Sequence, residues 1–158
     1  MLLEYYHYKL SLLNKKIASL SIKTKEGMWI ESKGFQNPVT HNKLPKLYII
    51  KNKSEIIYVG IASRSITNRL RDGFAAKGKG GYHGYRWKDL QDDIEILIWC
   101  FPGKSLQYVE SIEAEVVFAI RNHTGQWPNF QTEIHFHNVT DEEQKLAFLI
   151  YTKAMDAR

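Results

Sequence analysis

A basic and aromatic stretch between residues 64 and 89 is the first feature of this 158-residue sequence that could do chemistry. The stretch contains seven Lys or Arg and two Asp, so its net charge of +5 equals that of the whole chain. Such a patch suits a polyanion, because cations that neutralise phosphates release counterions. Its middle part, AAKGKGGYHGYRW, mixes glycines, aromatic rings and cations, which suits bases and phosphates at a DNA surface. A solvated surface loop is the alternative interpretation. We expect DNA to contact Arg64, Arg71, Lys77, Lys79, His83, Tyr85 and Arg86.

A second group with metal-binding potential is the segment TEIHFHN. In an extended chain, Glu133, His135 and His137 project from one face, and two histidines with a carboxylate can bind zinc. No fourth ligand is evident, and alternating histidines are more often the polar face of a sheet. Zinc is therefore the less favoured chemistry.

Composition excludes several classes of protein. The chain is 44% hydrophobic and 25% charged, which is typical of a globular domain rather than a disordered one. Cys100 is its single cysteine, so an intrachain disulfide and a cysteine-based zinc site are excluded. Glu4 and Lys9 interrupt the apolar start, which argues against a signal peptide or membrane anchor. We expect a cytoplasmic protein that does not contact a membrane.

The elements that must position these groups follow from hydrophobic periodicity. Helical spacing of Leu3, Tyr6, Leu10, Leu13 and Ile17 predicts an N-terminal amphipathic helix. The apolar runs 47–50 and 56–59, joined by a polar turn, predict an antiparallel hairpin. A third strand is predicted over 94–100, and helices over 66–74, 106–121 and 140–156. The expected fold is therefore α/β in the α+β sense: a small, three-stranded, mostly antiparallel sheet flanked by helices, with extra helices at both ends.

The predicted hairpin and the helix after it carry a family resemblance. Their sequences KLYII, YVG and ITNRLR resemble the GIY-YIG nuclease superfamily, in which two strand tyrosines lie about ten residues apart. Tyr48 and Tyr58 have that separation, and Gly60 ends the second motif. The helix segment IEAEVVFAIR and the later PNFQ continue the resemblance in the family's order. A divergent stand-alone member is therefore indicated.

The resemblance implies a metal-dependent endonuclease that hydrolyses DNA phosphodiester bonds. Tyr48 would position or deprotonate the attacking water, with Tyr58 as the second tyrosine. Arg69 would hold the scissile phosphate, because a planar guanidinium can bind two phosphate oxygens. Glu113 would bind one Mg²⁺, or Mn²⁺ in its place, and we prefer it to Glu115 as the metal ligand.

Three departures from the family pattern leave alternatives open. The first motif has Lys46 instead of a glycine, and the family asparagine falls on Gln131, or on Asn129. Many members have His or Tyr one turn after the arginine, where this chain has Gly73. Tyr82, His83 or Tyr85 in the next loop could substitute for that side chain. A nucleic-acid-binding module that has lost cutting is therefore the main alternative to a nuclease.

The resemblance also predicts how the chain is organised. We expect an N-terminal helical extension over 1–45, a nuclease domain over 46–138 and a C-terminal helix over 139–158 that packs on it. With one active site per chain, double-strand cutting would favour a homodimer.

Overall fold

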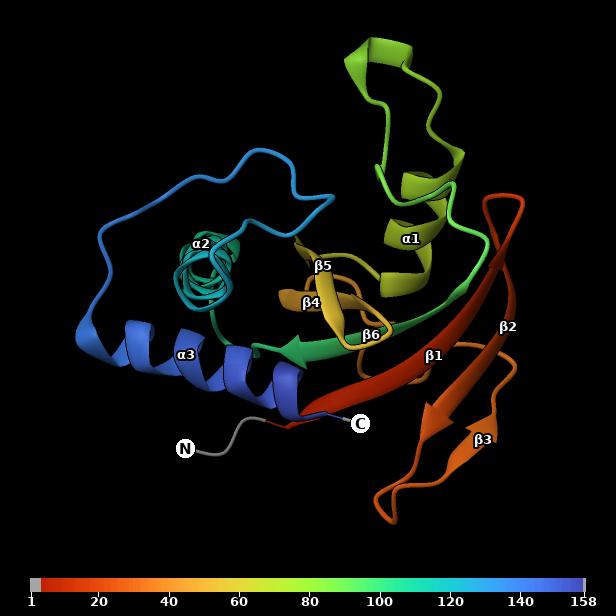
Figure 1. Cartoon of the computed structure of the whole chain (residues 1–158), viewed down its shortest axis with the longest axis horizontal. Coiled ribbons are helices and arrows are strands. Elements are labelled where there is room, and N and C mark those ends of the chain that lie inside the picture. The colour runs from red at the N-terminus through yellow and green to blue at the C-terminus, as the bar shows by residue number, and fades with distance from the viewer. Residues whose placement is uncertain (1–3, 158) are drawn as a thin grey trace.

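A computed structural model of the chain describes residues 4–157. A single antiparallel sheet of six strands, in the order β3-β2-β1-β6-β4-β5, runs through the molecule (Figure 1). The strands are β1 (Tyr5–Leu13), β2 (Lys16–Lys23), β3 (Trp29–Glu31), β4 (Lys46–Asn52), β5 (Glu55–Ala62) and β6 (Asp93–Cys100). The helices are α1 (Ile66–Ala75), α2 (Leu106–Thr124), α3 (Asp141–Asp156) and a short 3₁₀ turn, η1 (Lys79–Gly81).

The expected three-stranded sheet and the N-terminal helix are wrong, although the general α+β class fits. Residues 5–23 form the β1–β2 hairpin, and β1 pairs with β6 in the same sheet. Tyr8, Leu10 and Leu12 are buried, and their spacing of two residues is that of a strand with one face in the core. The helical spacing in the sequence therefore did not identify the buried face. Leu3, the first residue of that helical pattern, lies outside the described residues.

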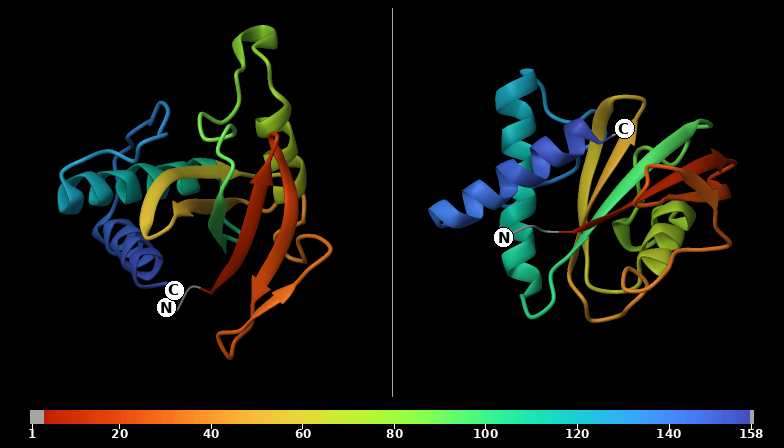
Figure 2. Two further views of the ribbon diagram at one scale, coloured as in Figure 1. Left: turned by 45° about the vertical axis from the view of Figure 1, so that its right-hand side comes forward. Right: turned by 90° about the horizontal axis from the view of Figure 1, so that it is seen from below.

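The tip of the β1–β2 hairpin is a two-residue turn. Asn14 and Lys15 have φ of 52° and 60°. Positive φ at both central residues is the geometry that lets a tight turn follow the twist of two antiparallel strands. This hairpin end lies beside α1 (Figures 1 and 2).

The helices cover opposite faces of the sheet (Figure 2). Ile66, Leu70 and Phe74 of α1 pack on a core that includes Tyr48, Tyr58 and Ile98. On the other face, α2 and α3 bury Leu47, Ile49, Leu97 and Trp99 among aliphatic side chains. Adjacent residues of β4 therefore belong to different cores, as expected for a strand covered on both faces.

Two buried lysines tie separate segments together. Lys46 is fully buried, and its Nζ donates to the carbonyl oxygens of His41, Leu44 and Arg64 at 2.7, 2.8 and 3.0 Å. Lys46 thus fixes the loop before β4 to the turn before α1. Lys51 similarly donates to the carbonyl oxygens of Ala154 and Ala157 at the end of α3, at 2.6 and 3.0 Å.

Candidate active site

Three tyrosines meet on the α1 side of the sheet. Tyr48 comes from β4, Tyr58 from β5 and Tyr85 from the loop before β6. The Tyr48 and Tyr85 hydroxyls share a hydrogen bond of 2.7 Å. The ring centroids of Tyr48 and Tyr85 lie 6.0 and 5.5 Å from that of Tyr58. Tyr85, which we expected at the DNA surface, is instead buried and stacks on Trp87 at 4.5 Å.

Two glycines make room for this cluster. A Cβ on Gly60 would lie 2.6 Å from the Tyr48 hydroxyl oxygen and 2.7 Å from the Tyr58 ring. A Cβ on Gly73 would lie 2.1 Å from the Tyr85 ring. The space where a side chain would leave α1 at Gly73 is therefore filled by Tyr85, one of the three residues the sequence suggested as substitutes. In the sequence, the glycine inside a predicted helix indicated that another residue fills this space. Only the structure identifies that residue as Tyr85.

Arg69 of α1 places a positive charge over this cluster. Its guanidinium carbon lies 4.7 Å from the centroid of the Tyr85 ring, a cation–π arrangement. Its Nη1 also donates to the hydroxyl of Tyr82, an exposed residue of the projecting loop, at 2.9 Å. The solvent-facing side of Arg69 is thus occupied by a phenol oxygen, where an anionic oxygen would bind more strongly.

Glu113 of α2 is 8% exposed, and its carboxylate, which is not completely sealed from solvent, has no hydrogen bond or ion pair to the described residues. Burial, with a smaller contribution from the charge of Glu110, raises the pKa of Glu113 to about 8, and the Arg69 cation opposes the rise. The same carboxylate acts on the pKa of Tyr58, so it lies close to the tyrosine cluster. Glu115 is more exposed and couples to neither Arg69 nor Tyr58. Of the two candidate glutamates, only Glu113 is part of this site.

Gln131 supports the site from the outer edge of the sheet. Its side-chain amide donates to the Val59 carbonyl oxygen and accepts from the Val59 N–H, both at 2.9 Å. The neighbouring Phe130 N–H donates to the Ile57 carbonyl oxygen at 3.0 Å. Residues 130 and 131 therefore pair with the free edge of β5 on the two sides of Tyr58. The amide atoms of Gln131 are engaged by the backbone of Val59 rather than directed at a reacting group.

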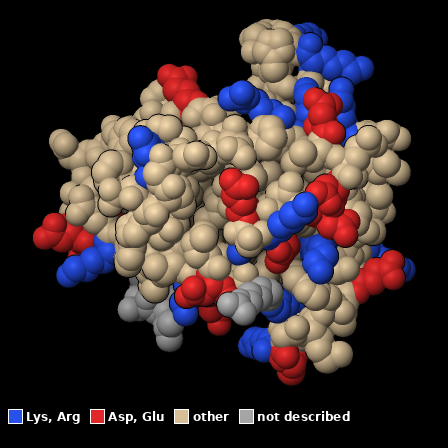
Figure 3. Space-filling view, viewed as in Figure 1, with Lys and Arg blue, Asp and Glu red and all other residues tan. Residues whose placement is uncertain are grey.

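The cations expected to bind DNA surround α1 and the loop that follows it. This loop projects from the molecule (Figures 1 and 2), and Lys and Arg gather around it (Figure 3). Lys77, Lys79, His83 and Arg86 are exposed there. Arg64 is paired with Asp72 at 2.6 Å, so its charge is partly compensated. Arg71, another of the cations expected to contact DNA, is exposed on α1.

Lys88 holds the base of this projecting loop. Its Nζ donates to the carbonyl oxygens of Ala76 and His83, each at 2.7 Å. The backbone N–H of Tyr85 donates to the Gly73 carbonyl oxygen at 3.1 Å, directly beside the tyrosine cluster. The loop is thus anchored at its base while its tip stays exposed.

The suggested zinc ligands do not converge. His137 pairs with Glu110 of α2 at 2.6 Å, while His135 lies 3.8 Å from Glu133. Residues 131–140 form no strand, so the expected alternation on one face is absent. Within residues 4–157 no group of three or more His, Cys, Asp or Glu could hold a metal ion together.

Glu113 can nevertheless serve as a ligand for Mg²⁺. This ion keeps several waters and is often bound by one or two carboxylates together with substrate phosphate oxygens. A buried carboxylate without a protein partner provides such an oxygen ligand. Binding of a cation would also relieve the unfavourable burial of the ionised form.

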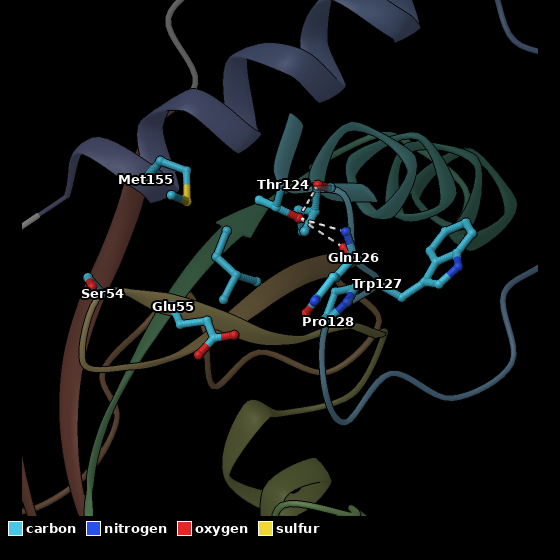
Figure 4. A pocket seen from close by; sticks show the side chains of 9 residues that line it. Ser54, Glu55, Thr124, Gln126, Trp127, Pro128 and Met155 are labelled. Atoms are coloured by element: carbon cyan, nitrogen blue, oxygen red, sulfur yellow. Dashed lines mark hydrogen bonds between the residues drawn. The ribbon is translucent and has the colours of Figure 1, made fainter. Parts of the chain in front are cut away.

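A cavity of about 360 Å³ lies apart from this site (Figure 4). Its lining includes Ser54, Glu55, Trp127 and Met155, and none of the tyrosines, Arg69 or Glu113.

No family model matches the chain, and no significant match was found among curated proteins or solved structures. Among the described residues, no helix has the length and apolar character needed to cross a membrane.

Proposed function

We propose that the chain is a Mg²⁺-dependent endonuclease of the GIY-YIG type that hydrolyses DNA phosphodiester bonds. The observation that carries the proposal is the unpaired, buried carboxylate of Glu113 beside Arg69 and Tyr58. A carboxylate whose pKa is strongly raised by burial costs stability, and such groups concentrate at functional sites. Here it comes together with the tyrosines and the arginine that the sequence resemblance selects.

Arg69 would bind the scissile phosphate. A phosphate oxygen would displace the Tyr82 hydroxyl from Nη1, because an ionised acceptor forms a stronger hydrogen bond with a guanidinium than a phenol does. The remaining donors of the guanidinium could then stabilise the negative charge that develops on the phosphoryl oxygens.

Tyr48 would orient the attacking water as a neutral phenol. Burial, and then the neighbouring Tyr85 and Tyr58, raise the pKa of Tyr48 well above its ordinary value, while Arg69 opposes the rise. The hydroxyl therefore keeps its proton near neutral pH. By donating to Tyr85 it can accept a hydrogen bond from water, so Tyr85 fixes the direction of that acceptor.

Glu113 would hold Mg²⁺ in this site. When bound, the ion would polarise a phosphoryl oxygen and lower the pKa of a coordinated water. Gln131 would act indirectly as a positioning residue, because it fixes the backbone of Val59 between Tyr58 and Gly60. The set of groups suits attack of water on phosphorus with departure of an alcohol oxygen.

A plasmid assay tests this proposal. Purified protein would be incubated with supercoiled plasmid in Mg²⁺ and in EDTA. Two variants would be tested beside it: Tyr48→Phe, and as a control Tyr108→Phe, whose ring packs against Phe101 in the first turn of α2. We expect Mg²⁺-dependent nicking or linearisation by the wild type and the control, and its loss in Tyr48→Phe. Equal cutting by Tyr48→Phe would contradict the role of this tyrosine.

One observation favours the alternative, a nucleic-acid-binding module without cutting activity. Tyr48 is 0% exposed, so a water reaches its hydroxyl only if side chains around it move. A salt-sensitive gel shift by wild-type protein, with no cutting of a panel of DNA and RNA substrates in Mg²⁺ or Mn²⁺, would favour the binding module.

A further inference from the structure

A cleft with cationic residues in its lining lies beside α1, outside the tyrosine cluster. It has a volume of about 550 Å³ and is formed where the β1–β2 hairpin tip approaches the end of α1 and the start of the projecting loop. Its cations are Lys15 and Lys16 from the hairpin, Arg71 from α1 and Lys77 from the loop. Phe74 and Ala76 contribute apolar surface.

The charge in this cleft is largely uncompensated. No carboxylate is among its lining residues. Asp89 reaches Lys15 at 3.4 Å in an exposed pair, and exposed pairs contribute little because water screens them. Asp72 lies 3.9 Å from Arg71 but is held more closely by Arg64 at 2.6 Å. Four cationic residues thus line one concave surface whose floor is largely apolar, and the two nearby carboxylates lie at its margin.

The cleft and the candidate active site flank the same helix. Arg69 and Arg71 are two residues apart on α1, so their side chains point about 200° apart around its axis. A helix with side chains is about 10–12 Å wide. The two arginines can therefore contact different phosphates of one bound DNA backbone.

We propose that this cleft binds backbone phosphates of the DNA substrate next to the phosphate held by Arg69. The inference rests on the proposed function for its choice of ligand, and it gives the β1–β2 hairpin a role as a second contact with the substrate. The cleft recognises charge and spacing rather than base sequence, because lysines and arginines on phosphates position a protein without reading bases.

The test is salt-dependent binding of a labelled 30-base-pair duplex in EDTA, measured by fluorescence anisotropy. The test variant is Lys15→Asn with Lys16→Gln, in which Asn suits the positive φ at position 15. The control is Lys25→Gln with Lys33→Gln, which removes the same charge from exposed positions on other turns of the N-terminal strands. Arg71→Gln serves as a second variant on the helix side of the cleft, and thermal melting checks that each protein folds.

We expect the slope of log K against log[NaCl] to become shallower by about 1.8 for the double variant, since each phosphate contact contributes about 0.9. Affinity at 100 mM NaCl should fall roughly 10- to 100-fold, with little change in the control. An unchanged slope in both cleft variants, with wild-type binding intact, overturns the cleft alone. A changed slope without any cutting supports the cleft and contradicts the nuclease. No wild-type binding overturns both.

Discussion

Tyr48 and Ile49 are neighbours in β4, and they face two differently built halves of the molecule. Ile49 points into an aliphatic core under α2 and α3. Tyr48 points under α1, where phenols and a guanidinium lie close together. The first core gains stability mainly from apolar burial. The second buries polar groups, and each of them costs folding free energy unless it forms a hydrogen bond.

The carboxylate of Glu113 shows this difference most clearly. It lies on α2, between the apolar Ile112 and Ala114, yet it has no partner among the described side chains. An apolar side chain there would serve stability better. Under the proposed function, the carboxylate stands there because it binds a metal ion.

Among the substitutions that test the difference between the two halves, we expect Glu113→Gln to change the free energy of unfolding most. The wild-type carboxyl has a pKa of about 8 in the folded state and an ordinary value of 4.5 when unfolded. Between these values the folded state binds more protons, so the free energy of unfolding decreases as pH rises. Glutamine avoids this penalty, which reaches roughly 5 kcal/mol well above pH 8.

Metal-free thermal melts between pH 4.5 and 9 measure this effect. We expect the two proteins to melt alike at the acid end and the variant to melt higher at pH 9. Adding Mg²⁺ should stabilise the wild type but not the variant. A difference that does not depend on pH would mean that Glu113 is already ionised at neutral pH.

Arg69→Ala tests the other charge of the site. We expect cleavage to fall about 100- to 1000-fold, equivalent to about 3–4 kcal/mol, because one preorganised donor group for the transition state is lost. The fold should persist, since the guanidinium is partly exposed. Cutting rates with saturating Mg²⁺ measure the loss, and Arg121→Ala on the exposed end of α2 is the matched control. A variant that cuts normally would remove Arg69 from the site.

The neighbouring pair Ile49→Ala and Tyr48→Phe separates stability from activity directly. Ile49→Ala should lower the free energy of unfolding by about 2–4 kcal/mol, because it opens a cavity in a packed core. Its cutting rate per folded molecule should stay near wild type. Tyr48→Phe should cost about 1 kcal/mol and lose cutting. Urea titrations beside cutting assays measure both quantities, and a Tyr48→Phe protein less stable than Ile49→Ala would reverse the comparison.

Tyr85→Phe should have the smallest effect. It removes the hydroxyl that pairs with Tyr48 and keeps the ring that fills the space at Gly73. We expect a stability loss of about 1 kcal/mol and a moderate, roughly tenfold, loss of cutting. Tyr151→Phe, on the α3 side, is the control for removal of a phenol. Equal effects of the two substitutions would show that the Tyr85 hydroxyl only supports the fold.

Much of the molecule around the site could be predicted from the sequence. The hairpin of β4 and β5, strand β6 and helices α1, α2 and α3 lie where short-range periodicity placed them. The N-terminal hairpin could not be obtained in this way, because Tyr6 and Leu10 fit the helical spacing while Tyr8, Leu10 and Leu12 fit a strand. Pairing of β1 with β6, more than 80 residues away, decides between them, and local sequence does not contain that contact.

The candidate site was predictable in its residue types more than in its contacts. Tyr48, Tyr58, Arg69 and Glu113 come together, as their order in the chain suggested. The role of Lys46 could not be predicted from the sequence, because a lysine at the start of a strand is ordinarily exposed. Its three carbonyl partners come from two segments that meet only in the folded chain. The position of Tyr85 depends on how a long loop returns to α1, which residue spacing does not determine.

The hydrogen bonds of Gln131 also have a consequence for solubility. An edge strand with free N–H and C=O groups can pair with the same strand of another molecule and start aggregation. Here β5 is an edge strand, and one side-chain amide occupies both polar groups of Val59. Gln131 thus blocks intermolecular strand pairing without a further strand, so β5 can stay at the edge of the sheet beside its tyrosine without becoming a template for fibrils.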